Sequence, residues 1–140
     1  MNINSLFGNA FHKMKERQWN CIYLVVDVHG TILQPSYLKN ESIFSFYPYA
    51  IEALQKLSDR DDICLIMFTS SYEEKQKFYQ ELFRQNVINF KYLNENPEVE
   101  NSDFACFDKK FYVDIGLDDK YGFEPQTDWR AILEYIDNNF

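Results

Sequence analysis

The sequence has no run of eighteen apolar residues and no apolar amino-terminal stretch followed by a small-residue cleavage pattern. These absences argue against a membrane span and a secretory signal. No stripe of basic residues is present, and the formal net charge of -8 would repel a nucleic-acid backbone. We therefore expect a cytoplasmic protein that binds neither membranes nor nucleic acid.

Paired cysteines and linker segments are also missing. Cys21, Cys64 and Cys106 form no CxxC motif, which favours reduced thiols over a disulfide or zinc site. No internal repeat and no tract rich in proline, glycine and serine divides the 140 residues, of which 46% are hydrophobic. We expect one domain over residues 1–140, with 1–19 as an amino-terminal helix or extension and 20–140 as the core.

Short apolar runs rich in β-branched and aromatic residues predict four buried strands. They span Cys21 to Val26, Ile63 to Phe68, Ile88 to Leu93 and Phe111 to Leu117. Helical periodicity lies between and around them. The sequence predicts a first helix over Ser5 to Lys15, a second with Pro48 in its first turn, a third capped by Ser71 and Glu74, and a last one capped by Thr127.

Strands that alternate with helices predict an α/β fold with a doubly wound, mostly parallel sheet and helices on both faces. Ligands of such sheets bind beyond the carboxyl ends of the strands. Asp27 follows the first predicted strand, Thr69 the second, and Asp118 and Asp119 the fourth. We therefore expect these side chains to share one edge of the sheet.

Carboxylates gathered at one edge repel one another, and the usual relief is a hard divalent cation with oxygen ligands. Magnesium is the expected ion. A phosphoryl group would then bind the metal, the Thr69 hydroxyl and a lysine of the Lys109–Lys110 pair, which leaves Asp27 placed for in-line attack on phosphorus.

The order Asp-x-x-Gly-Thr, strand-Thr, Lys, Asp-Asp resembles the four motifs of the haloacid dehalogenase superfamily. The resemblance spans residues 20–136 and is greatest to small capless members from bacteria and their phages. It is carried by the segments Phe68-Thr69-Ser70, Asn94-Glu95-Asn96-Pro97 and Leu117-Asp118-Asp119-Lys120. Too few residues separate Leu33 from Ile63 for a cap domain.

This resemblance implies a phosphatase in which Asp27 forms an aspartyl-phosphate and Asp118 with Asp119 completes the magnesium site. The family spacing favours Lys110 over Lys109 as the phosphate-binding lysine. The predicted catalytic residues are Asp27, His29, Thr69 and Lys110; the predicted substrate-binding residues are Gly30, Thr31, Thr69, Ser70 and Lys110; and the predicted metal-binding residues are Asp27, His29, Asp118 and Asp119.

His29 departs from the family pattern, which has a second acidic residue there. In the family this side chain protonates the leaving group and then activates water, while its backbone carbonyl binds the metal. The exchange should therefore spare magnesium binding. An imidazole with a reference pKa of ~6.5 can do acid/base work near neutral pH, and its failure would cost about 10²- to 10⁴-fold in rate.

Other functions remain open from the sequence. A catalytically weak module that binds metal or phosphate in a regulatory role is the main alternative, motivated by His29. A receiver domain also uses Asp, Thr, Lys and an acidic pair, but it carries the pair after its first strand. The small phosphorylated substrate cannot be named. An aromatic cluster, expected in the core or, less favoured, at a site lip or homo-oligomer surface, comprises Phe44, Phe46, Tyr47 and Tyr49.

Overall fold

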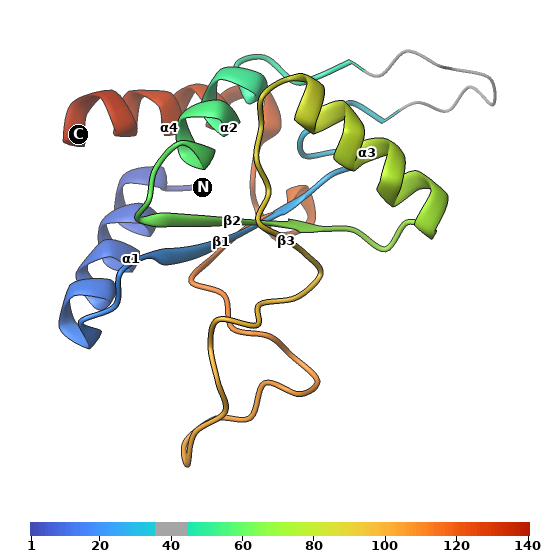
Figure 1. Cartoon of the computed structure of the whole chain (residues 1–140). Coiled ribbons are helices and arrows are strands. Elements are labelled where there is room, and N and C mark those ends of the chain that lie inside the picture. The colour runs from blue at the N-terminus through green and yellow to red at the C-terminus, as the bar shows by residue number, and fades with distance from the viewer. Residues whose placement is uncertain (36–44) are drawn as a thin grey trace.

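The computed structural model describes residues 1–35 and 45–140 (Figure 1). The elements are α1 (Ile3–Arg17), β1 (Ile22–Asp27), α2 (Ala50–Ser58), β2 (Ile63–Phe68), α3 (Glu73–Gln85), β3 (Tyr92–Leu93), β4 (Ile115–Leu117), a 3-10 turn (Asp119–Tyr121) and α4 (Pro125–Asn139). Helix α1 comes first, α2 and α3 each separate two strands, β4 follows β3 with no helix between them, and α4 comes last.

All four strands run parallel, in the order β3-β2-β1-β4. Helices provide the crossovers from β1 to β2 and from β2 to β3, as parallel pairing requires. Asp27 pairs with Phe68, and Val26 pairs with Leu117. The expected α/β parallel sheet is thus confirmed, and its register brings the residues that follow β1, β2 and β4 to one edge.

Helical side chains cover one face of the sheet. Buried residues of all four helices join Ile22, Leu24 and Val26 of β1 in the main apolar cluster. Tyr23 alternates to the opposite face, where a smaller cluster draws on strands and loops but on no described helix. In Figure 1, α2 and α4 lie on one side of the sheet and the chain between β3 and β4 lies on the other. The described helices therefore cover one face of the sheet, and the prediction of helices on both faces is wrong for the second face.

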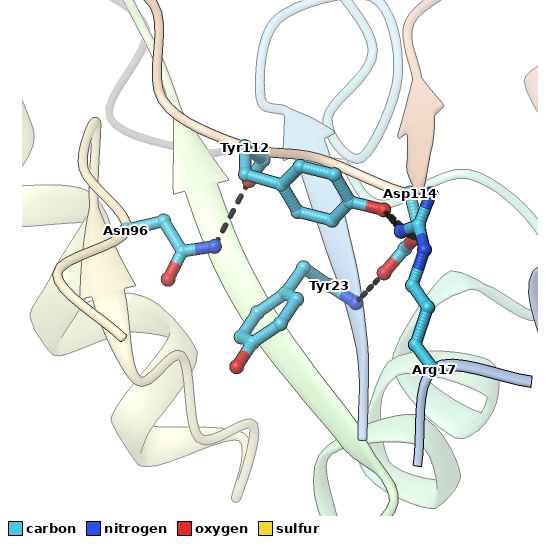
Figure 2. Close-up of polar contacts among 5 residues, drawn as sticks. All are labelled: Arg17, Tyr23, Asn96, Tyr112 and Asp114. Carbon is cyan, nitrogen blue, oxygen red and sulfur yellow. Dashed lines mark hydrogen bonds and ion pairs between the residues drawn. The ribbon is translucent and has the colours of Figure 1, made fainter. Parts of the chain in front are cut away.

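The long chain between β3 and β4 is fixed to the sheet by Asp114 (Figure 2). The Asp114 carboxylate accepts hydrogen bonds from the Tyr23 backbone N–H at 2.8 Å and from the Tyr112 hydroxyl at 2.6 Å. Arg17 hydrogen-bonds the same tyrosine, and its guanidinium lies 4.0 Å from Asp114. Nearby, Asn96 donates to the Tyr112 carbonyl at 2.9 Å. These contacts replace the missing helix as the cover of this face.

Several predicted boundaries need correction. The third strand shrinks to Tyr92–Leu93 and the fourth to Ile115–Leu117. The residues before each strand lie in loops, where single backbone hydrogen bonds, from Lys91 to Leu65 and from Asp114 to Tyr23, do not extend the strand. The predicted caps are wrong as well. Pro48 precedes α2, α3 begins after Tyr72 rather than at Ser71, and α4 begins at Pro125, ahead of Thr127.

The aromatic cluster divides. Phe46 and Tyr47 are half-buried against the main apolar cluster, as expected, whereas Tyr49 is exposed and Phe44 lies outside the described residues. All three cysteines are free thiols; Cys64 is buried, and Cys106 is exposed. Over residues 1–35 and 45–140, no helix combines the length and apolarity that a membrane crossing demands.

Candidate active site

Three carboxylates meet at the carboxyl edge of the sheet. Asp27 ends β1, Asp118 directly follows β4, and Asp119 opens the 3-10 turn. One carboxylate oxygen from each lies within 4.8 Å of the other two. Asp118 also caps the turn, because its side chain accepts the Lys120 N–H at 2.9 Å. The predicted convergence of these three residues is therefore present in the fold.

Thr31 ties the first loop to the acidic pair. Its buried hydroxyl lies 3.3 Å from both the Asp27 and Asp119 carboxylates and accepts the Asp119 backbone N–H at 3.1 Å. Its carbonyl accepts a 2.8 Å hydrogen bond from the indole N–H of Trp129, which is fully buried in α4. The loop after β1 is thus attached both to the core and to the carboxyl end of the neighbouring strand β4.

Gly30 permits this close approach. Its φ of +74° lies in the left-handed region that favours glycine, and a Cβ built there would sit 2.9 Å from an Asp119 oxygen. Any other residue would push the Asp119 carboxylate away. Gly30 and Thr31, predicted as substrate contacts, are therefore seen to shape the acidic cluster.

The cluster is electrostatically unfavourable as it stands. Burial, followed by the negative charge of Asp118, raises the pKa of Asp27 from 3.8 to about 6. Hydrogen bonds from the Val28 N–H and the Thr31 hydroxyl oppose this rise without cancelling it. Three oxygen donors with one raised pKa fit a hard divalent cation, whose charge would favour the ionised form of Asp27.

Thr69 follows Phe68, the residue of β2 that pairs with Asp27, and two hydrogen bonds hold its backbone. Its N–H donates to the Asn94 side-chain oxygen at 2.8 Å, and its carbonyl accepts from the Asn94 amide at 2.8 Å. The buried Thr69 hydroxyl lies 2.9 Å from that of Ser71. Ser70 is exposed. The reciprocal pairing with Asn94 was not predicted, although Asn94 belongs to a segment that carries the family resemblance.

His29 is exposed but has a defined neighbour. Its Nε2 is hydrogen-bonded to the hydroxyl of Tyr79, and the two rings meet edge-on with centroids 5.2 Å apart. Partial burial, together with the positive charge of Lys75, lowers the pKa of His29. Sequence periodicity predicts Tyr72 and Tyr79 on the buried side of α3. Tyr79 is buried as predicted, whereas Tyr72 is exposed, and the pattern carries no signal for the hydroxyl contact.

The lysines do not join the cluster. Lys110 is exposed and makes no hydrogen bond or ion pair with the described residues. Lys109 lines a hollow of about 250 Å³ together with Asn94 and Phe111. Phe111 in turn contacts Phe68, with ring centroids 6.2 Å apart. The segment before β4 therefore contacts the end of β2 through Phe111 and Phe68. The binding of phosphate by Lys110 stays a prediction.

A separate hollow lies away from the acidic cluster. A hollow of about 640 Å³ lies between α3 and the edge strand β3, and its lining includes Phe83, Arg84 and Tyr92 but none of the clustered carboxylates. Its titratable lining residues are Arg84, Lys91, Tyr92 and Glu95, so it holds a single carboxylate. We therefore locate the candidate site by its chemistry, at the acidic cluster.

One solved structure shares this architecture. It is a conserved protein from Bacteroides thetaiotaomicron, 27% identical, with a TM-score of 0.63 over 86% of this chain and 93% of the other. Family models and curated protein sequences yield no match. The likeness to the Bacteroides protein supports the α/β arrangement across most of both chains and carries no activity with it.

Proposed function

We propose that the protein is a magnesium-dependent phosphohydrolase of the haloacid dehalogenase type that acts on a small phosphate monoester. The observation that carries this proposal is the approach of the Asp27, Asp118 and Asp119 oxygens to within 4.8 Å of one another. Thr69 directly follows β2, the strand that pairs with β1, and its hydroxyl donates to that of Ser71. The order of these residues along the chain matches the family motifs quoted above.

The proposed chemistry has two steps. A carboxylate oxygen of Asp27 attacks phosphorus, an aspartyl-phosphate forms, and the bond to the ester oxygen breaks while that oxygen takes a proton from His29. Water then attacks the same phosphorus and gives a proton back to His29, and inorganic phosphate leaves as the Asp27 carboxylate is restored. The Thr69 hydroxyl and Lys110 would hold the phosphoryl oxygens.

Magnesium would be held by Asp27, Asp118 and Asp119 with the backbone carbonyl of His29. When bound, it would offset the charge of the carboxylates and of the phosphoryl group. The donor set supports this assignment, because hard cations prefer carboxylate and carbonyl oxygens. Burial and the charge of Asp118 raise the pKa of Asp27, and the charge of a bound cation would oppose this rise.

Hydrolysis of p-nitrophenyl phosphate and a panel of metabolite phosphates tests the proposal. We expect turnover with magnesium, loss of turnover with a chelator, and loss of at least about 10³-fold in Asp27→Asn, because the nucleophile is removed. Asp61→Asn is the matched control, since Asp61 is exposed and precedes β2 at the other end of the sheet. Absence of turnover across the panel at several pH values would refute the proposal.

The second candidate is a phosphate- or metal-binding module with little turnover. Two observations favour it: His29 replaces the family acid, and Lys110 makes no contact with the cluster in the described residues. His29→Asp separates the two candidates. A large gain in activity would indicate a degenerate enzyme, whereas a loss would indicate that histidine has taken over the acid/base role.

A further inference from the structure

The buried hydroxyl of Tyr79 connects two strand ends of the candidate site. Tyr79 lies in α3 with no exposed surface, and its hydroxyl is hydrogen-bonded to His29 Nε2. Burial raises the pKa of Tyr79, and the neighbouring Ser71 side chain opposes this rise. Ser71 in turn receives the 2.9 Å hydrogen bond of Thr69. Polar side chains therefore connect Thr69, in the loop after β2, with His29 after β1.

This arrangement distinguishes the two nitrogens of the His29 ring. Nε2 is occupied by Tyr79, and the edge-on contact of the rings, at an interplanar angle of 77°, restricts rotation about the side chain. Nδ1 is therefore the nitrogen left to exchange a proton with a substrate. When Nε2 carries its hydrogen, the Tyr79 oxygen accepts it.

We propose that Tyr79 is a positioning residue for His29, which holds Nε2 and so presents Nδ1 to the leaving-group oxygen. The inference rests on the proposed function. In the first step Nδ1–H of the imidazolium gives its proton to the ester oxygen as the bond to phosphorus breaks. In the second step Nδ1 takes a proton from the attacking water, which restores the imidazolium. The Nε2–H hydrogen bond to Tyr79 is kept in both steps.

A geometric consequence concerns the kind of ester that benefits. Esters with a poor leaving group, such as alkyl phosphates, need the proton from His29, whereas p-nitrophenolate leaves without one. Loss of the Tyr79 hydroxyl should therefore lower kcat/KM for alkyl phosphates and leave it nearly unchanged for p-nitrophenyl phosphate. A tyrosine that merely fills the core would affect both esters alike.

The first experiment compares Tyr79→Phe with wild type using ethyl phosphate and p-nitrophenyl phosphate. The substitution keeps the ring and removes only the hydroxyl. We expect kcat/KM, which reports the steps up to alcohol release, to fall about 10- to 100-fold for ethyl phosphate and less than about threefold for p-nitrophenyl phosphate. Tyr135→Phe, at a buried tyrosine of α4, is the control and should change neither value. Equal losses for both esters in Tyr79→Phe would overturn the inference.

The second experiment needs no activity. The chain has two histidines, His12 and His29, so ring ¹⁵N chemical shifts are readily assigned. We expect the neutral form of His29 in wild type to favour one tautomer, and we expect Tyr79→Phe to shift it toward the tautomer mixture of an unrestrained imidazole. Unchanged His29 shifts would overturn the positioning by Tyr79, whether or not any ester is hydrolysed. Changed shifts in a protein without turnover would instead refute the proposed function and, with it, the leaving-group effect.

Discussion

The loop after β1 and the segment before β4 both border the candidate site, but the fold controls them differently. The first loop is fixed at the site itself, through Thr31 to Asp119 and through Trp129 to the core. The segment is fixed by Asp114 at the start of β1, away from the site, and its two lysines are exposed. The acidic half of the site is thus built by core contacts, whereas bound phosphate is expected to order the basic half.

The largest expected effect comes from cutting the contact between the first loop and the core. Trp129→Phe leaves the buried Thr31 carbonyl without a donor and opens a cavity, so we expect a loss of about 3 kcal/mol in the free energy of unfolding. Magnesium should also stabilise this variant less than wild type, because the carboxylates are no longer aligned. Urea unfolding with and without magnesium measures both.

The other tryptophan supplies the comparison. Trp19 packs on the opposite face, edge-on to Tyr23 and Tyr112 with centroids 6.0 and 5.2 Å away, and it is only half-buried. Trp19→Phe should cost about 1 kcal/mol and leave the stabilisation by magnesium unchanged. Equal magnesium effects in the two variants would show that the contact with Trp129 does not set the acidic cluster.

The three clustered carboxylates could be predicted from the sequence, because each one directly follows, or lies next to, the end of a predicted strand. Asp27, Asp118 and Asp119 each follow an apolar run, and parallel pairing then leaves them one common edge. The loop that covers the second face was not predictable in the same way. Its apolar residues 111–113 suit a strand in isolation, yet they pack as a loop because Asp114 holds the chain through Tyr23.

Side-chain contacts between elements far apart in the sequence could not be predicted either. Ser71 and Glu74 match a capping box, but the Ser71 hydroxyl is engaged by Thr69, and α3 therefore starts without a side-chain cap. Tyr79 shows the same limit. Helical periodicity identifies it as buried, while the partner of its hydroxyl comes from the loop after β1, and no local pattern encodes that meeting.

A smaller effect of opposite sign is expected from Asp27→Asn. The raised pKa means that the folded state binds the Asp27 proton more tightly than the unfolded chain, so the stability of the protonated form is lost as pH rises from 3.8 through about 6. Without metal, the variant should exceed wild type by about 1 to 2 kcal/mol near pH ~7.5, after allowance for solvent screening. The difference should vanish near pH ~4.

Urea unfolding of wild type and Asp27→Asn, each with chelator and with magnesium, tests this prediction. Magnesium should stabilise wild type and leave Asp27→Asn nearly unchanged, because the variant lacks one charged ligand. Wild type and variant of equal stability in chelator at both pH values would mean that neither burial nor the charge of Asp118 destabilises the ionised form of Asp27.

The smallest effect on folding is expected for the basic half. Lys109 and Lys110 are both exposed, so replacement of either by methionine should change the free energy of unfolding by less than about 0.5 kcal/mol. Inhibition by inorganic phosphate should separate them. A charge-assisted hydrogen bond to phosphate contributes about 1.5 to 3 kcal/mol, so Lys110→Met should raise the inhibition constant about 10- to 100-fold and Lys109→Met less than about twofold. The reverse ranking would assign phosphate to Lys109, which shares its hollow with Asn94, the partner of Thr69.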